Sequence, residues 1–287
     1  MTTNPGGSDA VSLFKRTPLF FKEESASELM KFVPPFGYKF QKMDVKGVLE
    51  RQKNATLPPT QKFSTCAVVG NSGTLKLAEM GAEIDSHDAV FRVNHAPPPH
   101  FPEGQKHIRI AGSKTTWRIV TSRWFDEARR DPEQRLLVLC DRPFLYSCQN
   151  ILFETGPKAL AHPVNPRFYG AVQSFAGASK IPLAGLVTAA IAVKTCDSVS
   201  TYGLSTMQIP DHPAGGGGGK ARGNGAGKSA GGPRVCGYYY ACSGAPGLRS
   251  DAAYHSRPGD AEFHDFPAHA ATLRRWNESG MLQIRVR

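Results

Sequence analysis

The sequence predicts an α/β fold in which one domain is built on a mostly parallel, twisted sheet flanked by helices. The chain has 287 residues, enough for a self-sufficient core, and 40% of them are hydrophobic. Short apolar runs alternate along it with stretches that favour helices. This alternation is typical of βαβ units, whose parallel strands are covered on both faces.

Residues 1–62 are predicted to form a poorly defined N-terminal extension, and residues 63–287 to form the domain itself. The extension contains an apolar cluster at residues 19–21 and a helix-favouring stretch at residues 25–32. Neither segment carries a pattern typical of a catalytic site.

The first predicted strand covers residues 65–70, where a Val-rich run ends at the turn Asn71-Ser72-Gly73. A helix-permissive segment follows the turn and extends to Ala82. The same criteria predict helices at residues 125–130 and 185–195, and strands at residues 89–94, 116–121, 136–140 and 198–204.

The last quarter of the chain combines an insert with a final helix and strand. Residues 214–234 contain ten Gly and four Lys or Arg but no acidic residue, which predicts a disordered, cationic insert. Pro267 suits the first turn of a helix, and Gly280 suits its left-handed end. Apolar residues at positions 282, 284 and 286 then alternate with polar ones, as in a half-buried edge strand.

The charge balance favours anionic partners. Lys and Arg outnumber Asp and Glu by 35 to 24, which gives a formal net charge of +11 and a pI near 9.5. Nucleotides, nucleic acids and membrane surfaces all suit such a charge. No apolar run approaches the roughly 18 residues of a membrane span. The first residues also lack the basic and apolar regions of a signal peptide. We therefore expect neither an anchor nor a secretory signal.

The turn after the first strand is ambiguous on its residues alone. Backbone N–H groups and short polar side chains in such a turn can hold a phosphate or a ribose. However, the spacing matches neither the G-x-G-x-x-G dinucleotide fingerprint nor the G-x-x-x-x-G-K-[ST] phosphate loop. Taken alone, the turn is therefore interpreted as a plain connection between a strand and a helix.

Two longer blocks resemble motifs of the eukaryotic sialyltransferases. Two runs together are similar to the large sialyl motif. They are residues 66–75, Cys-Ala-Val-Val-Gly-Asn-Ser-Gly-Thr-Leu, and residues 84–94, Ile-Asp-Ser-His-Asp-Ala-Val-Phe-Arg-Val-Asn. Residues 182–185, Pro-Leu-Ala-Gly, lead through a helical stretch to residues 195–203, Thr-Cys-Asp-Ser-Val-Ser-Thr-Tyr-Gly. This second block resembles the small sialyl motif.

Two shorter runs resemble the third and fourth motifs, and all four stand in the family's order. They are Tyr-Tyr-Tyr-Ala at residues 238–241 and His-Asp-Phe-Pro-Ala-His at residues 264–269. The chain departs from the family within these motifs. The hydroxyl pair of the small motif is Leu183-Ala184, the closing acid of the third motif is Ala241, and the Glu of the fourth is His269.

The resemblance implies a fold like that of the nucleotide-sugar glycosyltransferases. It also implies an inverting transfer of sialic acid, or a related keto sugar, from a CMP donor to a hydroxyl of a glycan acceptor on a glycoprotein or glycolipid. No metal or other cofactor is implied, in agreement with the lack of any Asp-x-Asp sequence. Family members are anchored in Golgi membranes, which implies the same compartment here.

The resemblance also assigns roles to individual residues. His264 matches the family's general base, and a position just before a helix would keep its imidazole neutral. Asn71, Ser72 and Asn94 match nucleotide-binding positions. Two further residues match positions near the donor phosphate: Gly185 at a helix start, and Tyr238 in place of a His. Finally, Cys66 and Cys196 match the two cysteines that the family joins by a disulfide.

Each of these residues also has a simpler interpretation. A turn explains Asn71, a strand-end cap explains Asn94, and edge-strand packing explains the tyrosines. His264 has the alternative of a capping or surface residue, with His255 as a second candidate base. For the two cysteines the alternative is a pair of reduced, buried thiols.

The leading function is therefore a sialyltransferase-like glycosyltransferase, with two rivals. The first rival is a degenerate, non-catalytic homologue that binds a nucleotide or glycan, which the missing hydroxyl pair and the missing Glu favour. The second is an RNA- or DNA-binding protein, which the net charge and the basic insert favour. The insert lacks aromatic residues for base stacking, so we expect no nucleic-acid partner.

Overall fold

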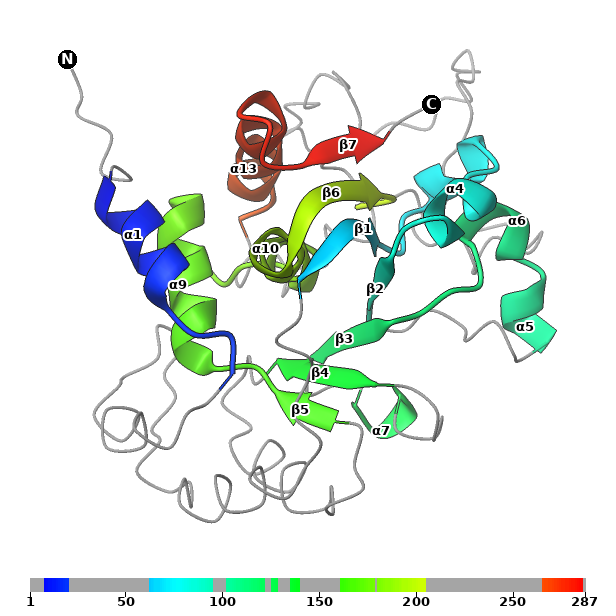
Figure 1. Cartoon of the computed structure of the whole chain (residues 1–287), viewed down its shortest axis with the longest axis horizontal. Helices are drawn as coiled ribbons and strands as arrows, with labels where there is room; N and C mark the ends of the chain where they lie inside the picture. Colours follow the sequence, from blue (N-terminus) through cyan, green and yellow to red (C-terminus); the bar gives the residue numbers. More distant parts are fainter. Residues whose placement is uncertain are drawn as a thin grey trace, which may run out of the picture.

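The computed structural model describes residues 8–20, 62–94, 102–121, 125–128, 135–139, 161–178, 180–204 and 265–285. Seven strands, all parallel, form one sheet in the order β5-β4-β3-β2-β1-β6-β7 (Figure 1). The predicted α/β class is therefore confirmed. The strands are β1 (Phe63–Val69), β2 (Ala89–Val93), β3 (Trp117–Thr121), β4 (Leu136–Leu139), β5 (Ala161–Pro163), β6 (Cys196–Tyr202) and β7 (Gln283–Arg285).

Helices pack on both faces of this sheet (Figure 1). On one face lie α1 (Ser8–Arg16), α9 (Pro166–Ala176), α10 (Ala184–Thr195) and α13 (Phe266–Glu278). On the other lie η3 (Gly73–Leu77), α4 (Gly81–Asp85), α6 (Ile108–Ala111) and α7 (Phe125–Ala128). A further short helix, α5 (Pro102–Gln105), precedes α6.

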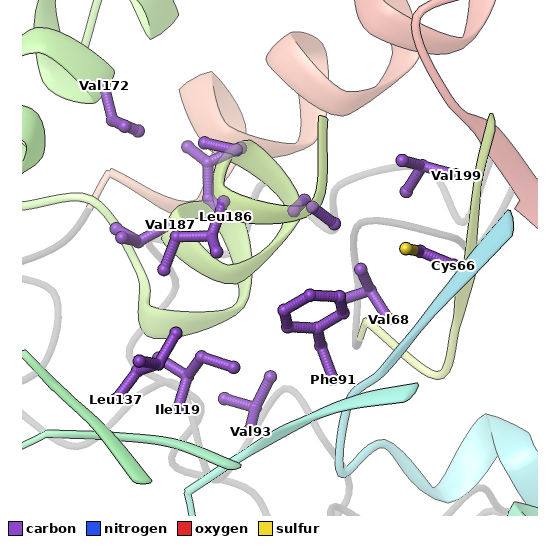
Figure 2. Close-up of a cluster of buried hydrophobic side chains, with 14 of the residues drawn as sticks. Cys66, Val68, Phe91, Val93, Ile119, Leu137, Val172, Leu186, Val187 and Val199 are labelled. Atoms are coloured by element: carbon purple, nitrogen blue, oxygen red, sulfur yellow. The ribbon is translucent and has the colours of Figure 1, made fainter. Parts of the chain in front are cut away.

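Alternating side chains on the strands build a large core on one face of the sheet and two smaller cores on the other, the second of these around α7. In β1, Cys66 and Val68 face α10, whereas Ala67 and Val69 face η3 and α4. Figure 2 shows the larger core, in which strand side chains meet α10. Residues 186–192 of α10 are all buried, which explains why this helix is apolar on every side.

Most of the predicted elements are present with shifts of one to three residues. The strand expected at residues 198–204 begins at Cys196, directly where α10 ends, and stops at Tyr202. The final helix and the edge strand are confirmed, including Pro267 in the first helical turn and Gly280 at φ +73°. The insert at residues 214–234 and the stretch at residues 25–32 lie outside the described residues.

Part of the predicted N-terminal extension packs into the domain, which the sequence analysis did not anticipate. Helix α1 lies beside α9 (Figure 1). The Phe14 ring stacks on Phe175 with centroids 4.6 Å apart. The Lys194 ammonium of α10 donates to the carbonyl oxygens of Phe14 and Lys15 at 3.0 and 2.8 Å. These bonds satisfy carbonyl groups in the last turn of α1. The packed core therefore begins before residue 63.

A buried histidine lies on β5, the edge strand at the end of the sheet away from β7. His162 of β5 is 5% exposed and lies between the rings of Phe20 and Trp117. Burial, with a smaller contribution from the charge of Arg135, lowers the pKa of His162 from 6.5 to about 4. The folded protein therefore holds this imidazole in its neutral form at neutral pH.

We expect His162 to make the fold less stable in mild acid. Between pH 6.5 and about 4 the unfolded chain binds a proton at this residue and the folded chain does not. The free energy of unfolding should therefore fall by on the order of 3 kcal/mol as the pH is lowered through this window. Urea unfolding at several pH values, on the wild type and on His162→Phe, measures this effect. Equal pH dependence in the two proteins would contradict the prediction.

Candidate nucleotide-binding site

The carboxyl ends of β1 and β6 meet at the point where the strand order changes direction. From β1 the chain adds β2 to β5 on one side, and then places β6 and β7 on the other side (Figure 1). The connection after β1 runs on the η3 face, whereas α13, which precedes β7, lies on the opposite face. A crevice between two such connections is where open α/β sheets bind ligands. The turn at residues 70–73 and residues 203–204 both lie at this place.

Two glycines allow the two strand ends to approach closely. The amide of Gly70 donates to the carbonyl oxygen of Tyr202 at 2.8 Å, and the amide of Ser72 donates to that of Gly203 at 3.0 Å. A Cβ atom on Gly70 would collide with the Gly203 carbonyl, and Gly203 itself has φ +58°. The sequence analysis did not assign Gly203 a role, although a Gly at the end of a predicted strand is a signal for close backbone approach.

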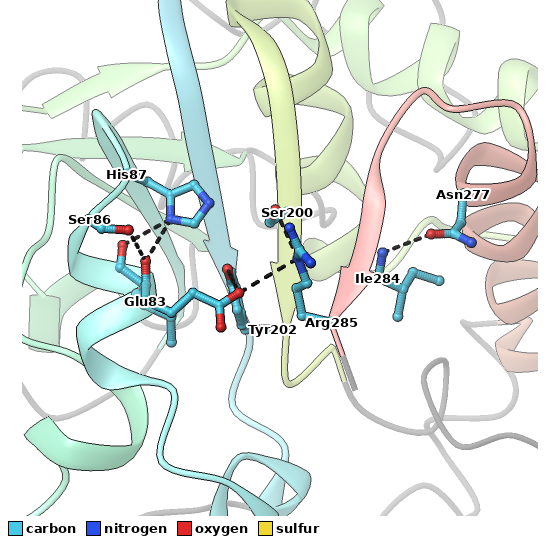
Figure 3. Close-up of polar contacts among 9 residues, drawn as sticks. Glu83, Ser86, His87, Ser200, Tyr202, Asn277, Ile284 and Arg285 are labelled. Carbon is cyan, nitrogen blue, oxygen red and sulfur yellow. Dashed lines mark hydrogen bonds and ion pairs between the residues drawn. The ribbon is translucent and has the colours of Figure 1, made fainter. Parts of the chain in front are cut away.

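A polar network fastens α4 to β6 and β7 near this switch point (Figure 3). The Glu83 carboxylate accepts a hydrogen bond from the Tyr202 hydroxyl at 2.9 Å and lies 3.6 Å from Nε of Arg285. Burial, and then Glu83, raise the pKa of the Tyr202 phenol well above its usual value. The phenol is therefore a hydrogen-bond donor at neutral pH. Its bond to Glu83 fixes Tyr202, the residue directly before Gly203.

The Asn71 amide has its nitrogen bonded, whereas its oxygen has no partner among the described residues. Its Nδ2 donates to the carbonyl oxygen of Val93 at 2.9 Å, so the end of β1 is tied to the end of β2. Its Oδ1 is buried and accepts no hydrogen bond within the described part of the chain. A buried acceptor without a donor costs free energy, so a ligand that donates to Oδ1 would be favoured.

Ser72 has a local structural role. Its hydroxyl oxygen accepts from the amide of Thr74 at 3.2 Å and caps η3, and the side chain is only 2% exposed. A nucleotide contact by Ser72 stays a prediction.

Asn94 ends β2 in the left-handed region, at φ +50°. Its Oδ1 accepts from the amide of Thr121 at 3.0 Å, so the side chain does cap the end of β3, as the simpler interpretation expected. Within the described residues, its Nδ2 donates to no acceptor. Asn94 thus offers a donor at the same edge of the sheet where Asn71 offers an acceptor.

Gly185 lies in the first turn of α10, two residues after the N-cap position, where a hydroxyl side chain would cap the helix. The N-cap residue is Leu183, whose side chain makes no capping bond. Because α10 runs directly into β6, its N-terminus lies at the carboxyl edge of the sheet. Free N–H groups at this end suit an anion such as a phosphate.

His264 and Tyr238 lie outside the described residues, as does Ala241. The structure does describe the helix that follows His264. It is capped by Asp265, whose Oδ1 accepts from the amide of Ala268 at 3.1 Å. Asp265 therefore caps α13, which leaves no need for His264 to do so. His269, at the family's Glu position, is fully buried within α13.

Comparison with known proteins identifies the family. The family model for glycosyltransferase family 29 (sialyltransferase) matches residues 20–214. The chain belongs to glycosyltransferase family 29. The resemblance that its motifs suggest is thus confirmed, and the match begins inside the predicted N-terminal extension.

Several curated proteins of this family are similar to the chain. Sialyltransferase-like protein 2 of Arabidopsis thaliana is 29% identical over 177 residues, which are 59% of this chain and 37% of that protein. The Homo sapiens CMP-N-acetylneuraminate-beta-1,4-galactoside alpha-2,3-sialyltransferase is 35% identical over 125 residues, 42% of this chain and 31% of that protein. The chain thus matches about a third of the length of these relatives.

Solved structures of sialyltransferases share the fold. A crystal structure of a mammalian sialyltransferase superposes with a TM-score of 0.52 at 20% sequence identity, covering 97% of this chain and 85% of that one. A second, in complex with Gal-beta-1-3GalNAc-ortho-nitrophenol, gives a TM-score of 0.50 at 19% identity, covering 100% and 87%. At this level of identity the likeness concerns the fold alone.

The disulfide that the family resemblance implies is present. Cys66 of β1 and Cys196 at the start of β6 are bonded, with their Cα atoms 6.1 Å apart. Both lie in the core under α10, so the bond joins the two strands that meet at the switch point of the sheet. None of the described helices of this family 29 chain is long and apolar enough to span a bilayer.

Proposed function

We propose that this family 29 protein transfers sialic acid, or a related keto sugar, from a CMP donor to a hydroxyl of a glycan acceptor. The observation that carries the proposal is the pair of half-bonded amides at the switch point of the sheet. Asn71 presents the acceptor Oδ1 and Asn94 the donor Nδ2. A nucleoside, whose ribose and base carry both donors and acceptors, can satisfy both amides.

The chemistry divides among three groups of atoms. The N-terminal N–H groups of α10, around Gly185, would stabilise charge on the departing CMP phosphate. Tyr238 would donate a further hydrogen bond to that phosphate, and His264 would remove the proton from the acceptor hydroxyl. Attack on the face of the anomeric carbon opposite the phosphate gives inversion, and no step calls for a metal ion.

The Golgi lumen is the compartment that we propose. Disulfides persist in oxidising compartments, and the bond between Cys66 and Cys196 fits that environment. Two N-x-[ST] sequences, at Asn54 and Asn277, agree with a secretory route.

One observation favours a second candidate, a homologue that binds CMP or a glycan without transfer. Leu183 and Ala184 leave the first turn of α10 without a side-chain cap or a hydroxyl for the phosphate. Calorimetry with CMP and a panel of CMP-sugars, followed by assays of donor hydrolysis and transfer, separates the two candidates. Binding without turnover selects the second.

Replacing Asn71 by Ala is expected to weaken CMP binding about tenfold, because the ligand loses one buried hydrogen bond. Turnover at saturating donor should change much less. Asn277→Ala is the matched control, since the Asn277 side chain also bonds to a backbone group, with its Oδ1 accepting from the amide of Ile284 at 2.9 Å. Isothermal titration of both variants with CMP measures the effect. Equal dissociation constants for the two variants would remove Asn71 from the site.

A further inference from the structure

A buried arginine on β3 holds the backbone of Asn94. Arg118 is 2% exposed, and its Nη1 donates to the carbonyl oxygen of Asn94 at 3.0 Å. A buried guanidinium is stable only when it is hydrogen-bonded, and a bond from a charged donor is stronger than a neutral one. The sequence analysis assigned no role to Arg118.

The bond matters because Asn94 has an uncommon backbone conformation. Few non-glycine residues adopt positive φ angles, and they do so where surrounding contacts hold them. Among the described residues, three hydrogen bonds hold Asn94, and all of them come from β3. Its amide donates to the carbonyl oxygen of Ile119 at 2.7 Å, its Oδ1 accepts from Thr121, and its carbonyl oxygen accepts from Arg118.

These three bonds determine which atom of the side chain faces a ligand. Since Oδ1 is directed at the Thr121 amide, Nδ2 is the end of the amide that remains for a ligand. If the Asn94 backbone relaxed from the left-handed region, Oδ1 would leave Thr121 and the amide could rotate. The Nδ2 group of Asn94 would then lose its fixed direction as a hydrogen-bond donor.

We propose that Arg118 is a positioning residue, which orients the Asn94 amide for binding of the nucleotide. The role in binding rests on the proposed function, whereas the effect on Asn94 itself does not. Arg118 acts through the Asn94 carbonyl group, so its effect on a ligand passes through the direction of Nδ2.

The neighbouring strand supplies a matched control. Arg92 of β2 is also buried, at 3% exposure, and its guanidinium donates to the carbonyl oxygens of Ala111 and Lys114 and to the Thr115 hydroxyl. These partners lie at the end of α6 and in the connection from it to β3. Arg92 is thus a second buried arginine, and none of these three partners is a candidate site residue.

The test compares Arg118→Met, Arg118→Lys and Arg92→Lys with the wild type. Amide hydrogen exchange at Asn94 and Thr121 is followed by NMR without ligand and normalised to the Val68 amide in β1. CMP affinity is measured by calorimetry. We expect Arg118→Met to exchange about tenfold faster at both amides and to bind CMP about tenfold more weakly. Arg118→Lys, which keeps a charged donor, should lie in between, and Arg92→Lys should change neither quantity.

Unchanged exchange at Asn94 and Thr121 in Arg118→Met would overturn the proposal. So would an equal loss of CMP affinity in Arg92→Lys, because that result is expected of general destabilisation. If the wild type binds no CMP but Arg118→Met still loosens Asn94, the proposed function fails while the positioning of Asn94 by Arg118 stands.

Discussion

Replacement of His264 by Ala is expected to lower kcat for sialyl transfer by about 10²- to 10⁴-fold, the usual contribution of one positioned acid or base. The affinity for CMP should change little, because the base acts on the acceptor hydroxyl in the transition state and touches the leaving group little. The residue directly precedes Asp265, the N-cap of α13. Transfer kinetics and CMP calorimetry on the same variant measure both quantities.

His255→Ala serves as the control for this assignment, since His255 is the other histidine considered as the base. If His255→Ala abolishes transfer and His264→Ala does not, the alignment of the fourth motif is wrong. If the wild type turns over no CMP-sugar, the non-catalytic homologue is the better description. The first positions to restore would then be Leu183, Ala184, Ala241 and His269.

Removal of the disulfide in a Cys66→Ala, Cys196→Ala double variant is expected to lower the free energy of unfolding by about 5 kcal/mol on the loop-entropy model. The bond spans a sequence separation of 130 residues, so it restricts the unfolded chain strongly. It also joins β1 to the start of β6, so CMP binding should weaken as the pairing of these two strands loosens. Urea unfolding of the wild type and the variant measures the difference in stability.

A thiol reductant provides the control for this experiment. It should destabilise the wild type by a similar amount and leave the double variant almost unchanged. If the reductant destabilises both proteins equally, other cysteines carry the effect and the bond between Cys66 and Cys196 contributes little.

Local sequence patterns predicted the elements that are long and apolar. Strands β1, β2, β3, β4 and β6 and helix α10 follow from such runs, because both faces of a parallel sheet are buried. Strand β5 was not predicted, since it has three residues, of which one is His162 and one is Pro163. Helix α9 was also not predicted, although its signals are present, with Asn165 as N-cap, Pro166 in the first turn and Gly177 at φ +63°.

Helix α1 shows a different limit of sequence analysis. Nothing within residues 8–16 indicates that the segment docks on α9. The contacts that hold it come from Phe175 and Lys194, which lie more than 150 residues further along the chain. A short helix of this kind is stabilised mainly by tertiary packing, so its own sequence carries only a weak signal.

The sequence by itself determined the class of fold, the family resemblance and the residues that stand at the strand ends, and the pairing of Cys66 with Cys196 followed only as what that resemblance implies. Only the tertiary structure decided what those residues offer to a ligand. The open atom of Asn71 is Oδ1 because its Nδ2 is bonded to Val93, 22 residues away, and the open atom of Asn94 is Nδ2 because its Oδ1 is bonded to Thr121, 27 residues away. An amide carries a donor and an acceptor on one short side chain, and which of them remains free depends on partners from neighbouring strands.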